Sequence, residues 1–220
     1  MIVTIDGPAG AGKSTVARLL AHRLGFRFLD TGAMYRAVAL AAHERGLDWN
    51  DDAGLVALAQ GLCIELPGDR VLVDGRDVTD TIRTVAVTNV TKHAANNPGV
   101  RRHLVELQRQ HGVGENLVTD GRDQGTVVFP EAACKIYLVA GAEERARRRQ
   151  ADLAARGEPV PFERLLAEQE RRDASDANRD EGPLAKAADA VEVCTDGLSI
   201  EQVVERLETL VRSRMPGGGR

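Results

Sequence analysis

The sequence has little of what marks membrane-bound, secreted or nucleic-acid-binding proteins. No apolar run approaches the roughly 20 residues that a helix needs to span a bilayer. The first residues, Met1-Ile2-Val3-Thr4, lack the basic leader of a signal peptide and read as the start of a strand. The formal net charge of −4 is opposite to the basic excess that nucleic-acid and membrane-surface binders carry. We therefore expect a cytoplasmic protein that binds neither membranes nor nucleic acids.

Cysteine and lysine are both scarce. The three cysteines, Cys63, Cys134 and Cys194, are odd in number and widely spaced, and each lies in an apolar, strand-like run. We expect buried, inert thiols in a reducing compartment rather than disulfides or metal ligands. Only four of the 29 basic residues are lysine, so 25 are arginine, whose planar fork pairs with phosphate and carboxylate. A GC-rich genome gives the same bias, so it does not indicate a function by itself.

The hydrophobic pattern is typical of a globular α/β protein. With 220 residues, 43% hydrophobic and 28% charged, the chain is long enough for one well-packed domain with an insertion, or for two small domains. Apolar runs of strand length alternate with segments of helical periodicity, which predicts a parallel sheet flanked by helices. The expected core strands are 2–5, 26–29, 117–119, 135–140 and 190–194. The expected helices include 13–24, 31–44 capped by Asp30 or Thr31, and one that starts at Ser199, with a capping box completed by Gln202, and runs to about Ser213.

Two regions depart from this alternation. Between Leu62 and Arg83, short apolar runs and the turns at 67–69 and 74–75 predict a small inserted antiparallel sheet. Between Arg145 and Arg179 the chain is rich in arginine, and Gly157 and a Pro-Val-Pro segment at 159–161 interrupt it. This second pattern predicts two helices joined by a mobile connection.

The segment GPAGAGKST at 7–15 matches the phosphate-loop pattern G-x-x-x-x-G-K-[ST]. Its glycines let backbone N–H groups turn inward around phosphate oxygens, Lys13 reaches the β- and γ-phosphates, and the Ser14 hydroxyl can bind Mg²⁺. The apolar IVTI before it and the amphipathic helix after it provide the context that the pattern requires. The expected ATP-binding residues are Gly7, Pro8, Ala9, Gly10, Ala11, Gly12, Lys13, Ser14 and Thr15.

A phosphate loop is compatible with a phosphotransferase or with a nucleotide-gated switch such as a GTPase. A guanine-specific switch would carry an N-K-x-D motif, which this sequence lacks. A lone D-x-x-G occurs at Asp51 to Gly54, but it opens a helical stretch instead of closing a strand. A phosphotransferase is therefore the favoured interpretation.

The stretch LVTDGRDQGTVVFP at 117–130 begins as a strand and ends in charges of both signs. Asp120 closes a strand that we expect beside the first, where its carboxylate can hold the water shell of Mg²⁺. Arg122 can clamp a phosphate in bidentate fashion, and Asp123 can accept from an amine or a ring N–H. The simpler alternative is a surface loop held by salt bridges.

Four motifs in this order, GPAGAGKST, LDTGAMYR, DGRDQGTVVFP and RRDASDANR, resemble those of the bacterial cytidylate kinases. The resemblance extends to about Arg212, and an adenylate kinase would instead carry D-G-[FY]-P-R at 120–124. It implies a P-loop nucleoside-monophosphate kinase that transfers the γ-phosphoryl of ATP, with Mg²⁺, to CMP or dCMP. It also implies that the protein is a monomer.

The resemblance assigns acceptor contacts to several residues. Thr31 corresponds to a hydroxyl that contacts the cytosine, and Arg36 to a phosphate-binding arginine. Arg101 and Asp123 correspond to a pair that reads the base, which fits cytosine because the ring offers two acceptors and one amine. Helix capping is the alternative for Thr31, and a solvated arginine at a helix start is the alternative for Arg101.

On the later arginine-rich segment, Arg172, Asp176 and Arg179 share one helix face. The resemblance places Arg172 and Asp176 near the ribose and Arg179 near the phosphates, whereas an Arg–Asp ladder on a solvated face is the simpler interpretation. Arg145, Arg148 and Arg149 correspond to an arginine-rich helix before the lid, and we expect Arg148 to contact ATP, whereas plain surface is the alternative for each of the three. Lys92 replaces a small hydroxyl residue that is common near the ribose, which leaves the choice between CMP and dCMP open.

The full prediction is a single domain with a P-loop nucleoside-monophosphate-kinase fold. Its core is expected at 1–30, 114–149 and 173–215, its acceptor-binding region with the inserted sheet at 31–113, its lid at 150–172 and a flexible tail at 216–220. The expected catalytic residues are Lys13, Asp120, Arg122 and Arg179, with Ser14 at the metal. Another small P-loop kinase, acting on UMP or a non-nucleotide acceptor, is the alternative, and a non-catalytic nucleotide-binding module is a third.

Overall fold

The computed structural model describes residues 1–155 and 157–215. The chain divides into two compact units. The core unit comprises Met1–Phe28 and Glu115–Arg220, and the helical unit comprises Leu29–Gly114. The tail expected at 216–220 lies outside the described residues.

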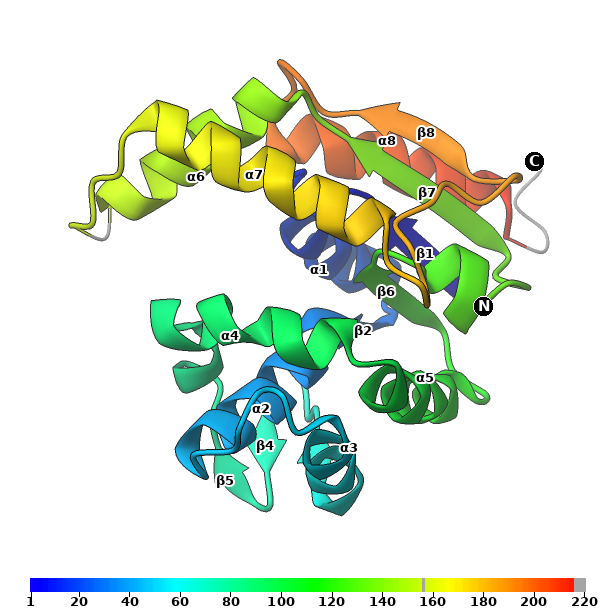
Figure 1. Cartoon of the computed structure of the whole chain (residues 1–220). Coiled ribbons are helices and arrows are strands. Elements are labelled where there is room, and N and C mark those ends of the chain that lie inside the picture. The colour runs from blue at the N-terminus through cyan, green and yellow to red at the C-terminus, as the bar shows by residue number, and fades with distance from the viewer. Residues whose placement is uncertain (156, 216–220) are drawn as a thin grey trace. The chain divides into compact units, whose positions relative to one another are not determined.

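A five-stranded sheet with strand order β2-β6-β1-β7-β8 is the centre of the core unit (Figure 1). β1 pairs in parallel with both β6 and β7, and β7 pairs in parallel with β8. The predicted parallel α/β sheet is therefore confirmed, with strand bounds that differ from the expected ones by one or two residues. The strands are β1 (Ile2–Asp6), β2 (Arg27–Asp30), β6 (Leu117–Gly121), β7 (Cys134–Val139) and β8 (Val191–Cys194).

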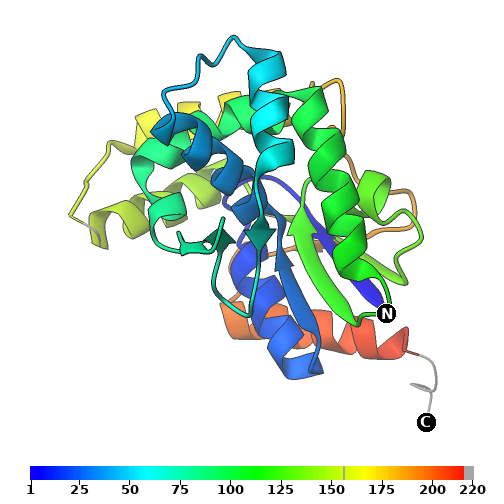
Figure 2. The same cartoon turned by 90° about the horizontal axis from the view of Figure 1, so that it is seen from below.

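Helices α1 (Lys13–Leu24) and α8 (Ile200–Ser213) lie side by side against this sheet (Figure 2). Their apolar stripes, with Leu20 and Leu207 fully buried, pack against alternate strand residues such as Ile5. The Ser199 side chain accepts a hydrogen bond from the Gln202 N–H, and the Gln202 side chain accepts from the Ser199 N–H. The predicted capping box is confirmed, and the helix extends to Ser213 as expected.

Helices α6 (Ala142–Ala155) and α7 (Phe162–Ala177) pair with each other through a small apolar cluster that includes Ala146, Leu153 and Leu165. The two predicted helices are thus confirmed, although α6 begins three residues before Arg145. The turn after β6 was not predicted: Gln124–Val128, labelled η2, forms a π-helical turn.

The helical unit contains α2 (Thr31–Glu44), α3 (Asp52–Gly61), α4 (Val85–Asn96) and α5 (Pro98–Gly112), with a short 3-10 turn, η1 (Thr81–Arg83). The predicted antiparallel insertion is confirmed as β3 (Ile64–Glu65), β4 (Leu72–Val73) and β5 (Arg76–Asp77). Asp51 caps α3 by accepting from the Gly54 N–H at 2.8 Å. The D-x-x-G at this position is therefore a helix cap.

The cysteines correct one expectation. Cys134 is fully buried on β7, but Cys63 and Cys194 are exposed, so their predicted burial is wrong. Cys194 ends the edge strand β8, where strand alternation buries Val193 and turns its neighbour outward. All three thiols are free.

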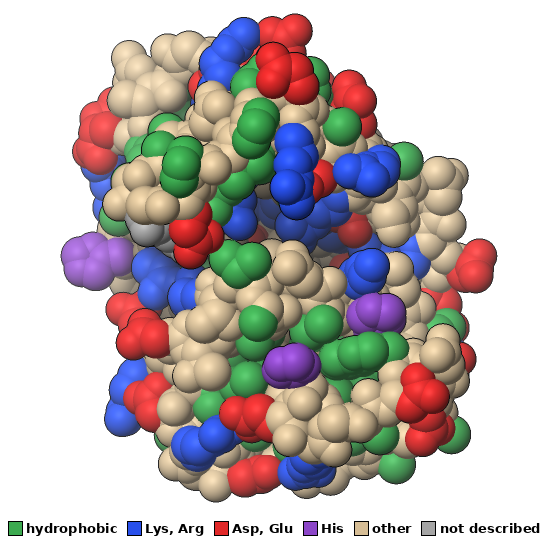
Figure 3. Space-filling model, turned by 60° about the vertical axis from the view of Figure 1, so that its left-hand side comes forward, with side chains coloured by type: hydrophobic (Ala, Val, Ile, Leu, Met, Phe, Trp, Pro, Cys, Tyr) green, Lys and Arg blue, Asp and Glu red, His purple; other side chains and the backbone are tan. Residues whose placement is uncertain are grey.

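The surface carries charges of both signs, and acidic and basic side chains are interspersed over the face shown in Figure 3. Among residues 1–155 and 157–215, no helix is long and apolar enough to cross a membrane.

Candidate functional site

The phosphate loop connects β1 to α1, as the sequence predicts. Gly7 has a φ of +149°, and a Cβ there would collide with the Leu138 carbonyl of β7. Gly12 has a φ of +88° and precedes the first turn of α1, which no side chain caps. The loop thus needs glycine for both its conformation and its closeness to the sheet, and it leads into a helix N-terminus suited to an anion.

Lys13 lies beneath this loop with only 5% of its surface exposed. Its Nζ donates a hydrogen bond to the Pro8 carbonyl at 2.7 Å. Burial, reinforced by the nearby Arg122, holds the pKa of Lys13 well below its usual range, against the opposing pull of Asp120. A bound triphosphate would supply negative charge that raises this pKa again.

Ser14 and Asp120 meet at the ends of α1 and β6. The Ser14 hydroxyl donates to Asp120 Oδ2 at 2.6 Å, and Asp120 is 5% exposed. The described part of the chain holds no cluster of three His, Cys, Asp or Glu side chains that could bind a metal. Mg²⁺ beside a triphosphate needs only one or two protein oxygens, because phosphates and water complete its coordination. This hydroxyl and carboxylate pair therefore fits the ion.

Asp6 is a buried carboxylate that sequence analysis did not select. It ends β1, immediately before the phosphate loop, and is 4% exposed. Burial raises its pKa to about 6, and the Asp123 charge adds to this, although hydrogen bonds from Gly125 and Gln124 and the Lys13 charge oppose it. The only signal in the sequence was a charged residue at the end of an otherwise apolar strand.

Three of the predicted residues form one partly buried network. Asp176 of α7 accepts from Arg122 Nε at 2.7 Å and also pairs with Arg179. Burial alone would raise the pKa of Asp176, but Arg122, Arg179 and Arg172 together hold it below its ordinary value. Asp176 is only 8% exposed, so the interpretation as a ladder on a solvated face is wrong for this residue. Arg172 itself lies at an exposed position of α7.

The paired helices α6 and α7 are attached to the phosphate loop by side chains. Arg145, 5% exposed, donates to the carbonyls of Ala140 (2.9 Å) and Ala9 (3.0 Å) and pairs with Asp173 at 2.7 Å. The Gln169 amide also donates to the Ala9 carbonyl. The resemblance leaves two interpretations of Arg145, an ATP contact and a plain surface residue, and no sequence pattern points to Gln169.

Arg148 does not contact the phosphate loop in this structure. Its Nε donates to Glu144 at 2.9 Å, and its two terminal nitrogens donate to the hydroxyl (3.0 Å) and the carbonyl (2.9 Å) of Thr195. These bonds use three of the five N–H donors of the guanidinium, so two donors remain for a nucleotide. Its contact with ATP stays a prediction.

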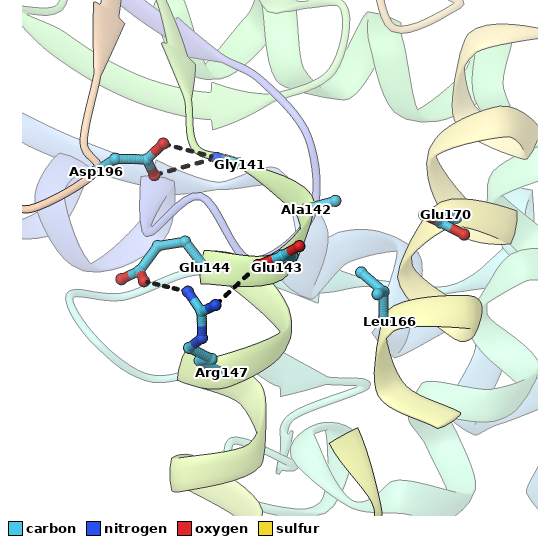
Figure 4. Close-up of a pocket in the computed structure, with 8 residues that line it drawn as sticks. All are labelled: Gly141, Ala142, Glu143, Glu144, Arg147, Leu166, Glu170 and Asp196. Carbon is cyan, nitrogen blue, oxygen red and sulfur yellow. Dashed lines mark hydrogen bonds and ion pairs between the residues drawn. The ribbon is translucent and has the colours of Figure 1, made fainter. Parts of the chain in front are cut away.

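A pocket of about 520 Å³ lies beside the start of α6 (Figure 4). Four carboxylates and one arginine are among its lining residues, and Figure 4 shows Arg147 between Glu143 and Glu144. Asp196 accepts there from the Gly141 N–H at 3.1 Å. The acidic lining disfavours phosphate, so we expect the triphosphate at the loop instead. The lining residues are Gly141, Ala142, Glu143, Glu144, Arg147, Leu166, Glu170 and Asp196.

In the helical unit, Thr31 is the first residue of α2 and is 3% exposed. The cap of this helix is Asp30, whose carboxylate accepts from the Ala33 N–H at 2.9 Å. Thr31 is therefore not needed as the helix cap, which removes the alternative explanation for it.

The two predicted arginines of this unit are held in place by neighbouring elements. Arg36 donates to the Thr88 hydroxyl of α4 at 2.8 Å and to the Ile82 carbonyl at 3.3 Å. Arg101 is 3% exposed, with its guanidinium carbon 5.5 Å from the centre of the Tyr35 ring. The alternative of a solvated Arg101 is therefore wrong.

Comparisons with known proteins agree over almost the whole length of the chain. A family model described as cytidylate kinase matches residues 3–213. A cytidylate kinase of Rhodopirellula baltica is 48% identical over 212 residues, covering 96% of this chain and 93% of the relative. One of Carboxydothermus hydrogenoformans is 49% identical over 215 residues, covering 96% and 97%. A solved structure of an uncharacterized protein from Eubacterium ventriosum has a TM-score of 0.53 at 10% identity, covers 97% of this chain and 99% of that one, and bears on the fold alone. The chain belongs to the cytidylate kinase family.

Proposed function

We propose that this protein transfers the γ-phosphoryl group of ATP to CMP and dCMP, giving ADP with CDP or dCDP. The observation that carries the proposal is the family match, which spans residues 3–213 and includes both the phosphate loop and the charged end of β6. The cytidylate kinases among the relatives cover more than nine-tenths of this chain, so no large part of it lies outside the similarity.

The donor phosphates bind at the phosphate loop in this proposal. Backbone N–H groups of Gly7–Gly12 and the N-terminus of α1 surround the phosphate oxygens, and Lys13 neutralises the β- and γ-phosphates. Arg145 and Gln169 support the proposal because both hold the Ala9 carbonyl, which keeps that peptide fixed while its neighbours contact the nucleotide. Arg148 is proposed to contact ATP as well.

Ser14 and Asp120 are the residues that would hold Mg²⁺. When bound, the ion neutralises charge on the β- and γ-phosphates and helps to align them. The contribution of this chain is to keep a hydroxyl and a carboxylate within 2.6 Å of each other at the start of α1. Asp120 is held at the end of β6, so the position of the carboxylate is set by the sheet.

We propose that arginines contact the phosphate of the acceptor nucleotide, and that one aspartate and one arginine contact its base. Arg122 and Arg179 share Asp176 as their counter-charge, so both guanidinium groups are already oriented before a phosphate arrives. Asp123 accepts from the cytosine amine, and Arg101 donates to the ring acceptors. The complete proposed set is Thr31, Arg36, Arg101, Arg122, Asp123, Arg172, Asp176 and Arg179.

Catalysis requires no covalent intermediate. The protein aligns two phosphates that repel each other, and Lys13, Arg122 and Arg179 offset the negative charge in the transition state. Water must be excluded, because it would otherwise accept the phosphoryl group, and α6 and α7 are proposed to act as the lid that excludes it. We further propose that the protein acts as a monomer in the cytoplasm, without nucleic-acid or membrane partners.

Formation of ADP from ATP, measured with CMP, dCMP, UMP, AMP and no acceptor, tests the proposal. We expect rapid turnover with CMP or dCMP, weaker turnover with UMP, and little with AMP or without an acceptor. Equal rates with and without acceptors would contradict a kinase, and preference for UMP or AMP would contradict the acceptor assignment.

A further inference from the structure

We propose that Asp6 is a positioning residue for the acceptor, holding the turn that carries Arg122 and Asp123 against the start of the phosphate loop. This inference rests on the function proposed above, because Arg122 and Asp123 are proposed acceptor contacts. Asp6 would touch neither substrate. It acts through the backbone of the turn.

The strand register places Asp6 and Asp120 on opposite faces of the sheet. Asp120 is paired with Ile5, and Asp6 is paired with Gly121 on β6 and Tyr137 on β7. Paired residues of parallel strands direct their side chains to the same face, and successive residues alternate. Asp120 therefore faces α1, where it meets Ser14, whereas Asp6 faces the other side, where the turn η2 lies.

Both oxygens of the Asp6 carboxylate accept hydrogen bonds from the backbone of this turn. Oδ1 accepts from the Gln124 N–H at 2.8 Å, and Oδ2 accepts from the Gly125 N–H at 2.7 Å. Both bonds are buried and charge-assisted, so they are short and directional. Gln124 and Gly125 directly follow Asp123 in the chain. Fixing their backbone N–H groups therefore also fixes the backbone position from which the Asp123 side chain extends.

The residues around these bonds fix the turn to the same face of the sheet. The Thr119 hydroxyl donates to the Gln124 side-chain carbonyl at 3.0 Å. A Cβ on Gly125 would lie 2.9 Å from the Thr4 hydroxyl oxygen and 3.3 Å from Asp6 Oδ2. Only glycine at position 125 lets the turn approach closely enough for both carboxylate bonds.

The chemistry of the site calls for a carboxylate. An ionised aspartate has two acceptor oxygens, whereas asparagine replaces one of them with an NH₂ group that can only donate. With asparagine at position 6, one of the two N–H groups would face another donor, and the turn would move away from it. Burial of the Asp6 charge costs free energy. A carboxylate at this position is therefore favourable only if both of its hydrogen bonds to the turn are needed.

The phosphate loop has supports that do not depend on Asp6. Arg145 of α6 and Gln169 of α7 both donate to the Ala9 carbonyl. Loss of the Asp6 carboxylate should therefore disturb the acceptor more than ATP. A displacement of about 1 Å in a positioning group can cost roughly 100-fold in rate.

The experiment compares Asp6→Asn with Asp77→Asn in steady-state kinetics. Asp77 is an exposed carboxylate on β5 that also accepts a backbone N–H, from Thr79 at 3.0 Å, which makes it a matched control. For Asp6→Asn we expect kcat/KM for CMP to fall about 10- to 100-fold, while KM for ATP changes by less than about threefold. The ratio of kcat/KM for CMP to that for UMP should also fall, because Asp123 would no longer be aligned with the base. Asp77→Asn should match the wild type.

Two results would overturn the inference. Parallel rises in KM for CMP and ATP would indicate general damage to the fold, and a lower activity with an unchanged CMP-to-UMP ratio would show that the base contact does not depend on Asp6. If circular dichroism shows that Asp6→Asn is unfolded, Thr119→Val removes the side-chain bond to Gln124 and should give a smaller loss of the same, acceptor-selective kind. A loss selective for ATP in that variant would also overturn it.

Failure of the proposed function would look different. In that case the wild-type protein itself would not prefer CMP, and the variants would be compared with the acceptor that it does prefer. An acceptor-selective loss in Asp6→Asn would still support the positioning role, and a loss shared equally with ATP would refute it.

Discussion

The buried Asp6 carboxylate should make the stability of the protein depend on pH in a way that one substitution removes. Its pKa is raised from 3.8 to about 6 in the folded protein, mainly by burial. Lys13, Asp123 and the Tyr137 hydroxyl are the titratable groups that interact with it. The folded state therefore binds the Asp6 proton more tightly than the unfolded chain does. The stabilising contribution of this proton is fully present below pH 3.8 and is lost as pH rises through about 6.

The size of the effect follows from the two pKa values. A rise from 3.8 to about 6 corresponds to about 3 kcal/mol, at 1.36 kcal/mol for each tenfold change in proton affinity. Roughly half of this change, about 1.5 kcal/mol, should occur between pH 5 and pH 7.5, where the protein is far from general acid denaturation. Asp6→Asn does not titrate, so its free energy of unfolding should lack this component.

Urea unfolding followed by circular dichroism, at half-unit steps from pH 5 to pH 7.5, measures the effect directly. The quantity to compare is the wild-type free energy of unfolding minus that of Asp6→Asn, in which the titrations of groups that do not interact with Asp6 cancel. We expect the difference to fall by about 1.5 kcal/mol as pH rises over this range. The altered hydrogen bonding of asparagine adds only a constant offset. A difference that stays flat within about 0.5 kcal/mol would show that Asp6 has an ordinary pKa, and the burial argument would be wrong.

Three further predictions concern the proposed substrate contacts. Lys13→Ala should lower kcat at least about 100-fold with an unchanged circular dichroism spectrum, because it removes the charge nearest the transferred phosphoryl group; near-normal kcat would count against that role. Asp123→Ala should raise KM for CMP about 10-fold or more and leave KM for ATP nearly unchanged, and an equal rise in both would show that the base is read elsewhere. Asp176→Ala should lower the free energy of unfolding by about 3 kcal/mol, since it strips two arginines of their counter-charge, and should also bring the kcat/KM values for CMP and dCMP closer together. An unchanged ratio would remove Asp176 from the ribose site.

Local signals in the sequence were sufficient for much of the fold. The phosphate loop has required glycines at fixed spacing, so the start of α1 at Lys13 could be predicted to the residue. The capping box at Ser199 did the same for α8. The predicted strand ends differ from the observed ones by one or two residues, because an apolar run does not show where strand pairing stops.

The burial of charged groups could not be predicted in the same way. Arg101 and Arg145 look like surface arginines on polar helices, yet both are almost fully buried because their partners come from other elements. The prediction that Asp176 and Arg179 share a helix face is wrong, because α7 ends at Ala177, although the two side chains do pair. The bond from Arg122 to Asp176 depends on a residue 54 positions away. Helical periodicity describes neighbours within one element and says nothing of such distant partners.

Asp6 and the turn η2 show the same limit. The sequence indicated that Asp120 to Gly125 is a charged, glycine-containing strand end, and the proposal for its functional residues was built there. It gave no sign that the turn is π-helical or that a carboxylate from a different strand holds it. The predicted burial of Cys194 was wrong for a related reason, because an apolar run in the sequence does not determine which face of an edge strand is covered. Cys63 lies just before the two-residue strand β3 and is exposed there.

Following the transferred group is the decisive measurement of phosphoryl transfer from ATP to a cytidine monophosphate. The protein is incubated with Mg²⁺, CMP and ATP labelled at the γ-phosphate, and the products are separated by chromatography. The label should appear in CDP, in an amount equal to the ADP formed. Label released as inorganic phosphate, or ADP formed without labelled CDP, would contradict it.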